Sequence, residues 1–271
     1  MVSTTLLVEM TDIYWIRGEA IARRLAAEKY AVCVNDVQAN KPGIDTLVAE
    51  LNQKYGEGTA LGIVADVTKS SEVQSMIQES VKALGPLTVM IANAGIAQVK
   101  PVLDISEDDV RKMFDVNFMG VWNCYTLAAK QMISQGPLPE GSTGYKILGA
   151  ASIVAFKPFP MLSHYSASKW AVRGFTQVFA MEMARHSITV NAYAPGIVGT
   201  AMWDLIDEKL GEVEGRAKGE SMLKYSKDLT ALGRVSVPED VSKLVGGFLC
   251  SDDSAFVTGQ TLVVDGGIIF T

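Results

Sequence analysis

Short apolar runs rich in β-branched residues alternate along this chain with longer segments of helical period, and this alternation strongly constrains the fold. Strands that are apolar on both faces and separated by helices favour a parallel sheet with helices on each side. The sequence therefore predicts a doubly wound α/β fold with three layers, α/β/α. Seven segments are the predicted strands: Thr5–Val8, Ala31–Asn35, Ala60–Ala65, Thr88–Ala92, Lys146–Ala150, Ile188–Ala192 and Gln260–Val264.

The segments between these strands show the period of sheet-covering helices. Glu19–Glu28 and Ser70–Leu84 each place apolar side chains on one stripe, and Val241–Leu249 follows a proline, Pro238, suited to a first helical turn. The Gly/Pro-rich stretch 136–144 is predicted to be a surface loop rather than a boundary. We therefore expect one domain over residues 1–271.

The segment Trp203–Leu229 interrupts the alternation of strands and helices. It is charged and contains three glycines. One interpretation is a flap over an active site, because such covers are often long loops or loosely packed helices. An ordinary solvated excursion accounts for the composition equally well.

Composition excludes several classes of protein. The formal net charge is −6 and Lys and Arg are not clustered, which argues against binding to nucleic acid. Cys33, Cys124 and Cys250 lie far apart, so we expect three buried thiols and neither a metal site nor a disulfide. The chain shows no basic leader and no apolar run of membrane-spanning length, which predicts a cytoplasmic protein without a membrane partner.

Polar and small residues follow several predicted strands, where ligands of parallel α/β sheets bind. Asp36, Asp66, Ser152 and the pair Pro195-Gly196 stand at such positions, as does Asn93-Ala94-Gly95. These residues are therefore the first candidates for a binding site.

Tyr165 and Lys169 are four residues apart in a segment of helical period, which sets both side chains on one face. Alone, such a pair is as consistent with an ordinary surface contact. Here Ser152 lies thirteen residues upstream, and Asn117 sits within the helical stretch after the Asn-Ala-Gly turn. The company of Ser152 and Asn117 supports the pair as part of a larger motif.

In order and spacing, these motifs resemble those of the short-chain dehydrogenase/reductase family. The similarity runs from about Gly18 to the end of the chain and implies a Rossmann-like fold, a nicotinamide cofactor and a homotetramer paired through residues 110–134 and 163–186. It implies Asn117, Ser152, Tyr165 and Lys169 as catalytic residues. The implied cofactor-binding residues are Thr11, Gly18, Asp36, Asp66, Val67, Asn93, Ala94, Gly95, Tyr165, Lys169, Pro195, Gly196, Val198 and Thr200, and the implied substrate contacts are Ser152, Val154, Phe159, Tyr165 and Trp203.

The chemistry of the set is coherent. Reduction of a carbonyl leaves an alkoxide-like oxygen that needs a proton, and a phenol supplies one readily when nearby positive charge favours the phenolate. Lys169 and the oxidised nicotinamide would provide that charge. Ser152 would hold the substrate oxygen toward Tyr165. By resemblance, Asn117 anchors a water that links Lys169 to solvent.

Asp36 stands eighteen residues after Gly18, close to the interval at which an acidic side chain reaches the adenosine ribose. This favours NAD over NADP, because a carboxylate repels a 2′-phosphate. A capping aspartate at a strand end is the competing interpretation. By resemblance, Asp66 and Val67 flank the adenine.

The glycine-rich turn of the family is altered in this chain. The family pattern is Thr-Gly-x-x-x-Gly-x-Gly, yet between Thr11 and Gly18 two glycine positions hold Asp12 and Ile16. Glycine lets the backbone turn tightly and approach a pyrophosphate. Three explanations stay open: a remodelled loop in which Arg17 neutralises phosphate, weakened or lost cofactor binding, or a wrongly joined exon.

The C-terminal third resembles the acetoin/diacetyl reductase and 2,3-butanediol dehydrogenase branch, notably at 195–203, 232–234 and 258–267. That branch implies a small diketone or hydroxyketone substrate and NAD(H). Phe156 and Phe159 indicate a more apolar pocket wall. His164 is predicted to be packed or solvent-facing rather than an acid or base. The alternative function is a cofactor-impaired homologue, acting as an isomerase or cyclase or as a silent partner subunit.

Overall fold

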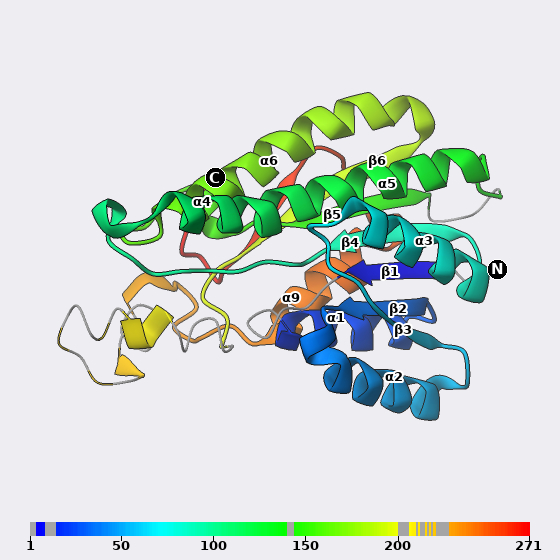
Figure 1. The fold of residues 1–271 in the computed structure, drawn as a ribbon, viewed down its shortest axis with the longest axis horizontal. Helices are drawn as coiled ribbons and strands as arrows, with labels where there is room; N and C mark the ends of the chain where they lie inside the picture. Colours follow the sequence, from blue (N-terminus) through cyan, green and yellow to red (C-terminus); the bar gives the residue numbers. More distant parts are fainter. Residues whose placement is uncertain are drawn as a thin grey trace.

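The core of the fold is one parallel sheet of seven strands in the order β3-β2-β1-β4-β5-β6-β7 (Figure 1). The computed structural model describes residues 4–8, 15–139, 144–199, 206–209, 211, 215, 217, 219–220 and 228–271. Every pair of neighbouring strands is parallel. The strands are β1 Thr4–Val8, β2 Ala31–Asp36, β3 Ala60–Val64, β4 Leu87–Ala92, β5 Tyr145–Ala150, β6 Ile188–Pro195 and β7 Thr261–Val264.

Helices cover both faces of the sheet (Figure 1). One face carries α1 (Trp15–Ala27), α2 (Lys41–Tyr55) and α9 (Pro238–Ser242), which continues as the π-helical η6 (Lys243–Leu249). The other carries α3 (Ser70–Leu84), α4 (Glu107–Phe114), α5 (Gly120–Gln135) and α6 (Ser163–Met183). The predicted α/β class, with a parallel sheet between two layers of helices, is confirmed.

Each layer of helices buries its own apolar core against the sheet. Tyr125, Val172 and Phe179 belong to the core under α3, α5 and α6. Ile21, Leu47 and Val245 belong to the core under α1, α2 and η6. The inner strands β2, β4 and β5 are buried along their whole length, as their apolar composition predicts. The three cysteines are buried, as expected.

Several boundaries differ from the sequence prediction. The helix expected at 19–28 begins at Trp15, and the strand expected to end at Ala192 runs on to Pro195. The helix expected at 241–249 starts at Pro238 and turns π-helical at Lys243. Most of the predicted flap at 203–229 lies outside the described residues.

The strand order places the carboxyl ends of all seven strands at one edge of the sheet. The winding reverses between β1 and β4, since β2 and β3 extend the sheet in one direction from β1 and β4 to β7 in the other. Such a reversal leaves a crevice beyond the strand ends, where α/β proteins bind ligands. Asp36, Asn93, Ser152 and Pro195 fall at this edge.

Candidate active site

Tyr165 and Lys169 lie together on the buried face of α6. Their exposed fractions are 4% and 0%, and the Lys169 Nζ lies 5.8 Å from the centroid of the Tyr165 ring. Lys169 also donates a hydrogen bond of 2.8 Å to the carbonyl of Ala150, the last residue of β5. The alternative of a surface pair is therefore wrong.

Burial, and after it the nearby Arg17 guanidinium, lower the pKa of Lys169 to about 7. Arg17 is itself buried, in the first turn of α1. A second cation beside a buried ammonium disfavours the charged form of that ammonium. Near neutral pH, Lys169 therefore populates both its charged and its neutral form.

Ser152 caps a short 3₁₀ turn, η4 (Ile153–Ala155), two residues beyond Ala150. Its Oγ accepts a hydrogen bond of 3.4 Å from the backbone N–H of Val154. The turn starts at the carboxyl end of β5, where Lys169 is bonded. The structure thus brings the Ser152 turn and the Tyr165–Lys169 face of α6 to the same place.

An apolar cluster surrounds Tyr165. Two of the predicted substrate contacts, Val154 and Phe159, pack in it beside Tyr165. Trp203, the remaining predicted contact, lies outside the described residues. The other members are Ile96, Ala97, Val99, Met113, Leu162 and Ile206. Such a wall suits a small substrate with little polar surface.

Asn117 is fully buried in a π-helical segment, η3 (Asp115–Met119), between α4 and α5. Its Oδ1 accepts from the backbone N–H of Ile96 at 2.8 Å, and its Nδ2 donates to the Ile96 carbonyl at 3.0 Å. Nδ2 also lies 3.1 Å from Ser168 Oγ. Asn117 therefore joins the segment after β4 to α6. Its contact on α6 is Ser168, the residue before Lys169.

His164, the neighbour of Tyr165, is packed rather than solvent-facing, with an exposed fraction of 4%. Its Nε2 lies 2.8 Å from Gln98 Oε1, and Gln98 Nε2 donates to Asp109 at 2.9 Å. Lys100 and Gln98 lower the pKa of Asp109, which stays ionised. The ionised carboxylate takes the amide N–H of Gln98, so His164 must donate from Nε2. Burial lowers the pKa of His164 and keeps it neutral.

Two predicted cofactor residues stand at the ends of β2 and β4. Asp36 is the last residue of β2 rather than the residue after it, and it is fully buried. Its carboxylate accepts from the Val37 N–H and from Asn40 Nδ2, each at 2.7 Å. Asn93 accepts from the Tyr193 hydroxyl at 2.6 Å and leads into Ala94 and Gly95.

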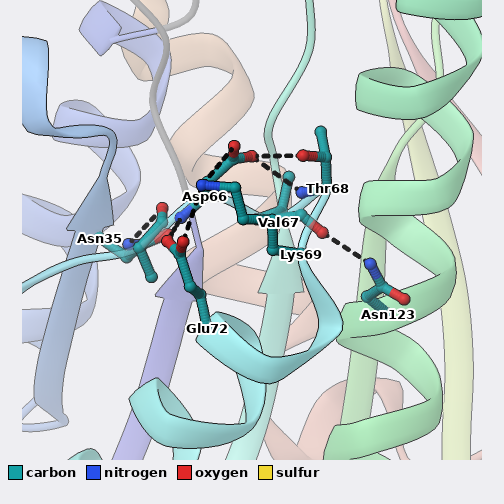
Figure 2. Close-up of polar contacts among 8 residues, drawn as sticks. Asn35, Asp66, Val67, Thr68, Lys69, Glu72 and Asn123 are labelled. Atoms are coloured by element: carbon teal, nitrogen blue, oxygen red, sulfur yellow. Dashed lines mark hydrogen bonds and ion pairs between the residues drawn. The ribbon is translucent and has the colours of Figure 1, made fainter.

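Asp66 and Val67 form a tight turn after β3 (Figure 2). Asp66 Oδ1 accepts from the backbone N–H and the hydroxyl of Thr68, and the Asp66 N–H donates to Glu72 at 2.8 Å. Asn123 of α5 donates to the Val67 carbonyl at 2.7 Å. Figure 2 shows these contacts converging on the turn from α3 and α5. These bonds hold the turn between α3 and α5 at the carboxyl end of β3.

The remaining predicted cofactor residues have mixed placements. Gly18 lies inside α1, and Val198 is buried against the core beneath α1. Gly196 follows β6, and a Cβ there would meet Asp265 Cβ at 2.6 Å. Packing against Asp265 therefore already demands a glycine. Thr11 and Thr200 lie outside the described residues, as does Asp12, and the structure describes the backbone but not the side chain of Ile16.

The donor set at this edge suits a nicotinamide dinucleotide. The ionised Asp36 carboxylate at the end of β2 is an acceptor suited to a ribose hydroxyl, although a bound ribose has to displace what covers it. The Arg17 guanidinium can pair with diphosphate oxygens. Lys169, which lies near Arg17, can stabilise a phenolate at Tyr165 when it is charged. The chemistry of the residues present therefore fits the group.

Sequence reasoning missed the residues that hold this site in place. Trp170 and Arg173 bond the Ser152 turn, Gln98 bonds His164, and Tyr193 bonds Asn93. Their partners are mostly backbone groups of irregular segments or residues far away in the chain. No spacing in the sequence signals such contacts.

Two comparisons place the chain among known proteins. A family model described as enoyl-(acyl carrier protein) reductase matches residues 18–269. Among curated proteins, an L-2,3-butanediol dehydrogenase of Corynebacterium glutamicum is 42% identical over 256 residues, covering 93% of this chain and 94% of that protein. A diacetyl reductase ((S)-acetoin forming) of Staphylococcus epidermidis is 37% identical, with the same coverage.

A solved structure shares the fold. The crystal structure of a dehydrogenase/reductase from Sinorhizobium meliloti superposes with a TM-score of 0.82 at 29% identity, covering 100% of this chain and 96% of that one. In the part of this chain that the structure describes, no helix is both long and apolar enough to cross a membrane.

Proposed function

Because the chain belongs to the short-chain dehydrogenase/reductase family and so acts on CH–OH groups, we propose that it interconverts a small ketone and its alcohol with NAD(H). The proposed substrates are vicinal diketones and hydroxyketones such as diacetyl and acetoin. The named activities of the butanediol dehydrogenase and the diacetyl reductase support this substrate class.

One observation carries the proposal: Tyr165 and Lys169 form a buried pair on α6 beside the Ser152 turn. Burying an ammonium costs free energy, and buried groups with perturbed pKa values cluster at functional sites. The apolar character of the cluster around Tyr165 suits the carbon skeleton of a small ketone.

We assign the roles as follows. The Ser152 hydroxyl donates to the substrate carbonyl oxygen and orients it. Tyr165 gives its phenolic proton to that oxygen during reduction and recovers a proton afterwards. Lys169, when charged, stabilises the phenolate left behind. Asn117 holds the segment after β4 in place and, through a water, links Lys169 to solvent. When bound, the nicotinamide supplies or accepts the hydride.

Asp36 supports NAD over NADP. Its carboxylate at the end of β2 would accept from the ribose hydroxyls and repel a 2′-phosphate. The remaining cofactor contacts in the proposal are Thr11, Gly18, Asp66, Val67, Asn93, Ala94, Gly95, Tyr165, Lys169, Pro195, Gly196, Val198 and Thr200, with Val154, Phe159 and Trp203 facing the substrate.

The test combines binding and turnover. Thermal unfolding with increasing NADH should shift to higher temperature, because a ligand of the folded state stabilises it. Diacetyl or acetoin should be reduced, and Tyr165→Phe should abolish turnover while the shift with NADH persists. Unchanged turnover in Tyr165→Phe would remove the assigned acid.

The runner-up is a cofactor-impaired member of the family, acting as an isomerase or cyclase or as a silent partner subunit. The altered positions Asp12 and Ile16 favour it. If neither NADH nor NADPH at millimolar concentration raises the unfolding temperature, the result favours the cofactor-impaired homologue. We further propose that residues 1–271 form one domain with a flap at about 203–229. We also propose a homotetramer in the cytoplasm, and light scattering in solution tests the assembly.

A further inference from the structure

The turn that carries Ser152 is bonded on both sides by side chains of α6, the helix that carries Tyr165. Ahead of Ser152, Lys169 donates to the Ala150 carbonyl at 2.8 Å. Behind it, Trp170 Nε1 donates to the Val154 carbonyl at 2.8 Å. Arg173 Nη1 donates to the Ala155 carbonyl at 3.0 Å. The backbone from 150 to 155 is thus bonded to the helix at three points.

The two bonds behind Ser152 fall on groups that the 3₁₀ turn itself leaves open. Inside the turn, Ala155 N–H bonds the Ser152 carbonyl at 2.9 Å and Phe156 N–H bonds the Ile153 carbonyl at 3.0 Å. The last carbonyls of any helical turn need partners from elsewhere. Trp170 and Arg173 supply them.

Arg173 is fixed by rings as well as by its hydrogen bond. Its Cζ lies 3.9 Å from the centroid of the Phe156 ring and 5.6 Å from that of Trp170. A guanidinium over an aromatic face is attracted by the ring quadrupole. Phe156 directly follows η4, so this contact holds the end of the turn against α6.

We propose that Trp170 and Arg173 are positioning residues that set the place of the Ser152 hydroxyl relative to Tyr165. Both act through the turn, and neither needs to touch the substrate. Tyr165, Trp170 and Arg173 all lie on α6. Because Trp170 and Arg173, the two anchors, bond the turn to this helix, they fix the position of Ser152 relative to Tyr165. The proposal rests on the proposed function, since it assumes that Ser152 orients the substrate oxygen.

The first experiment compares Trp170→Phe and Arg173→Met with the wild type in steady-state ketone reduction. Misplacing a catalytic group by about 1 Å can cost on the order of 100-fold in rate. We expect roughly 10-fold lower kcat in each variant, little change in KM for NADH, and largely retained kcat in Arg173→Lys, which keeps a donor. The control is Trp122→Phe: Trp122 on α5 is comparably exposed (42% against 46%) and, in the described structure, bonds no backbone group of the turn.

A double-mutant cycle shows whether the anchors act through Ser152. In a Ser152→Ala background, Trp170→Phe should lower kcat no further, because the hydroxyl that it positions is already gone. A second readout is independent of activity. Hydrogen exchange at the Ala155 and Phe156 amides should accelerate in Trp170→Phe and Arg173→Met but not in Trp122→Phe.

The outcomes separate this proposal from the proposed function. A wild type without ketone turnover, or Ser152→Ala with wild-type kcat, sinks the proposed function and the positioning role with it. If the wild type reduces the ketone and Ser152→Ala lowers kcat, then kcat within twofold of wild type in both Trp170→Phe and Arg173→Met overturns the positioning role alone. An equal loss in the Ser152→Ala background also overturns it.

Discussion

The Lys169 ammonium group lies 2.8 Å from the carbonyl oxygen of Ala150, so α6 is bonded to β5 at the strand end that leads to Ser152. This bond takes one of the three donors that an ammonium carries. The same burial that fixes the side chain also disfavours its charge. The protonation state of Lys169 is therefore controlled by its neighbours, chiefly by the desolvation of the site and then by Arg17.

Replacing Arg17 should raise the pKa of Lys169 above its value of about 7. In Arg17→Met the repelling guanidinium is gone while burial persists, so the pKa rises but stays below its ordinary value of 10.5. The measurement is an NMR titration of the lysine side-chain nitrogens in cofactor-free protein. Arg23→Met, on the same helix but paired with Glu19 and Glu50, is the control and should leave the titration unchanged. An unchanged Lys169 titration in Arg17→Met would contradict the assignment.

Replacing Asp36 should weaken the preference for NAD. In Asp36→Ser the carboxylate that would repel a 2′-phosphate is removed, so the ratio of kcat/KM with NADPH to that with NADH should rise. We expect roughly 10- to 100-fold, the equivalent of one contact to a charged group. Asp45→Ser, on the exposed face of α2 and paired with Lys41, should leave the ratio unchanged. A ratio that stays constant in Asp36→Ser would mean that the carboxylate is only a cap for Val37 and Asn40.

Much of the fold follows from local pattern. The helix predicted at 70–84 has those bounds in the structure, because an apolar stripe and a serine-rich start define it locally. The candidate residues lie at the carboxyl ends of the strands, as the sequence predicts, because parallel strands all end at one edge of the sheet. Tyr165 and Lys169 share a face because four residues are about one helical turn.

What escaped prediction depends on contacts between distant segments. The proximity of Arg17 to Lys169 joins α1 to α6, and the complete burial of Asp36 depends on packing that no spacing reveals. The π-helical turn at Asn117 likewise arises where the side chain reaches the Ile96 backbone, twenty-one residues away. Irregular turns of this kind are frequent at functional sites and have no sequence period.

Lowering the pH should destabilise the protein through His164. Burial lowers its folded pKa, so below an unfolded value of about 6.5 the unfolded chain takes up a proton that the folded chain does not. Stability is therefore lost as pH falls from about 6.5 toward the folded pKa. Urea unfolding at several pH values should show a smaller loss in His164→Gln. His186→Gln, which changes the only other histidine, should keep the loss. Equal slopes in His164→Gln and wild type would refute a titrating His164.

Removing the Asn117 side chain should cost both stability and turnover. Asn117→Ala leaves the N–H and carbonyl of Ile96 without their amide partner, a loss of about 1–3 kcal/mol. Asn52 makes the same pair of bonds to the Ala60 backbone, at 2.8 and 3.0 Å. Ala60 begins β3, so this contact lies at the opposite end of the strand from the candidate site. Asn52→Ala should therefore lose similar stability in urea but keep its kcat. If Asn117→Ala keeps wild-type kcat as well, Asn117 has a structural duty only.

Alanine substitutions at Gly196 and Gly174 test whether Gly196 lacks a side chain because of protein packing or because a cofactor approaches it. Gly196→Ala would bring a Cβ to 2.6 Å from Asp265 Cβ and 2.9 Å from its Cα, and such overpacking costs about 1–3 kcal/mol. Apart from its chain neighbours and its own helix backbone, no described atom lies within 4 Å of the missing Cβ of Gly174, inside α6. Gly174→Ala should therefore stabilise the helix by about 0.5–1 kcal/mol. Urea unfolding measures both changes.

The comparison decides what Gly196 is for. Destabilisation of Gly196→Ala with unchanged NADH affinity would mean that the missing side chain serves the contact with Asp265, the residue after β7, and that the dinucleotide needs only the backbone at 196. Unchanged stability with lost NADH affinity would mean the reverse, since the added methyl would then obstruct only the bound cofactor. Because a Cβ at 196 meets backbone as well as side-chain atoms of Asp265, the chain cannot relieve the clash by a rotamer change, and we expect the first result.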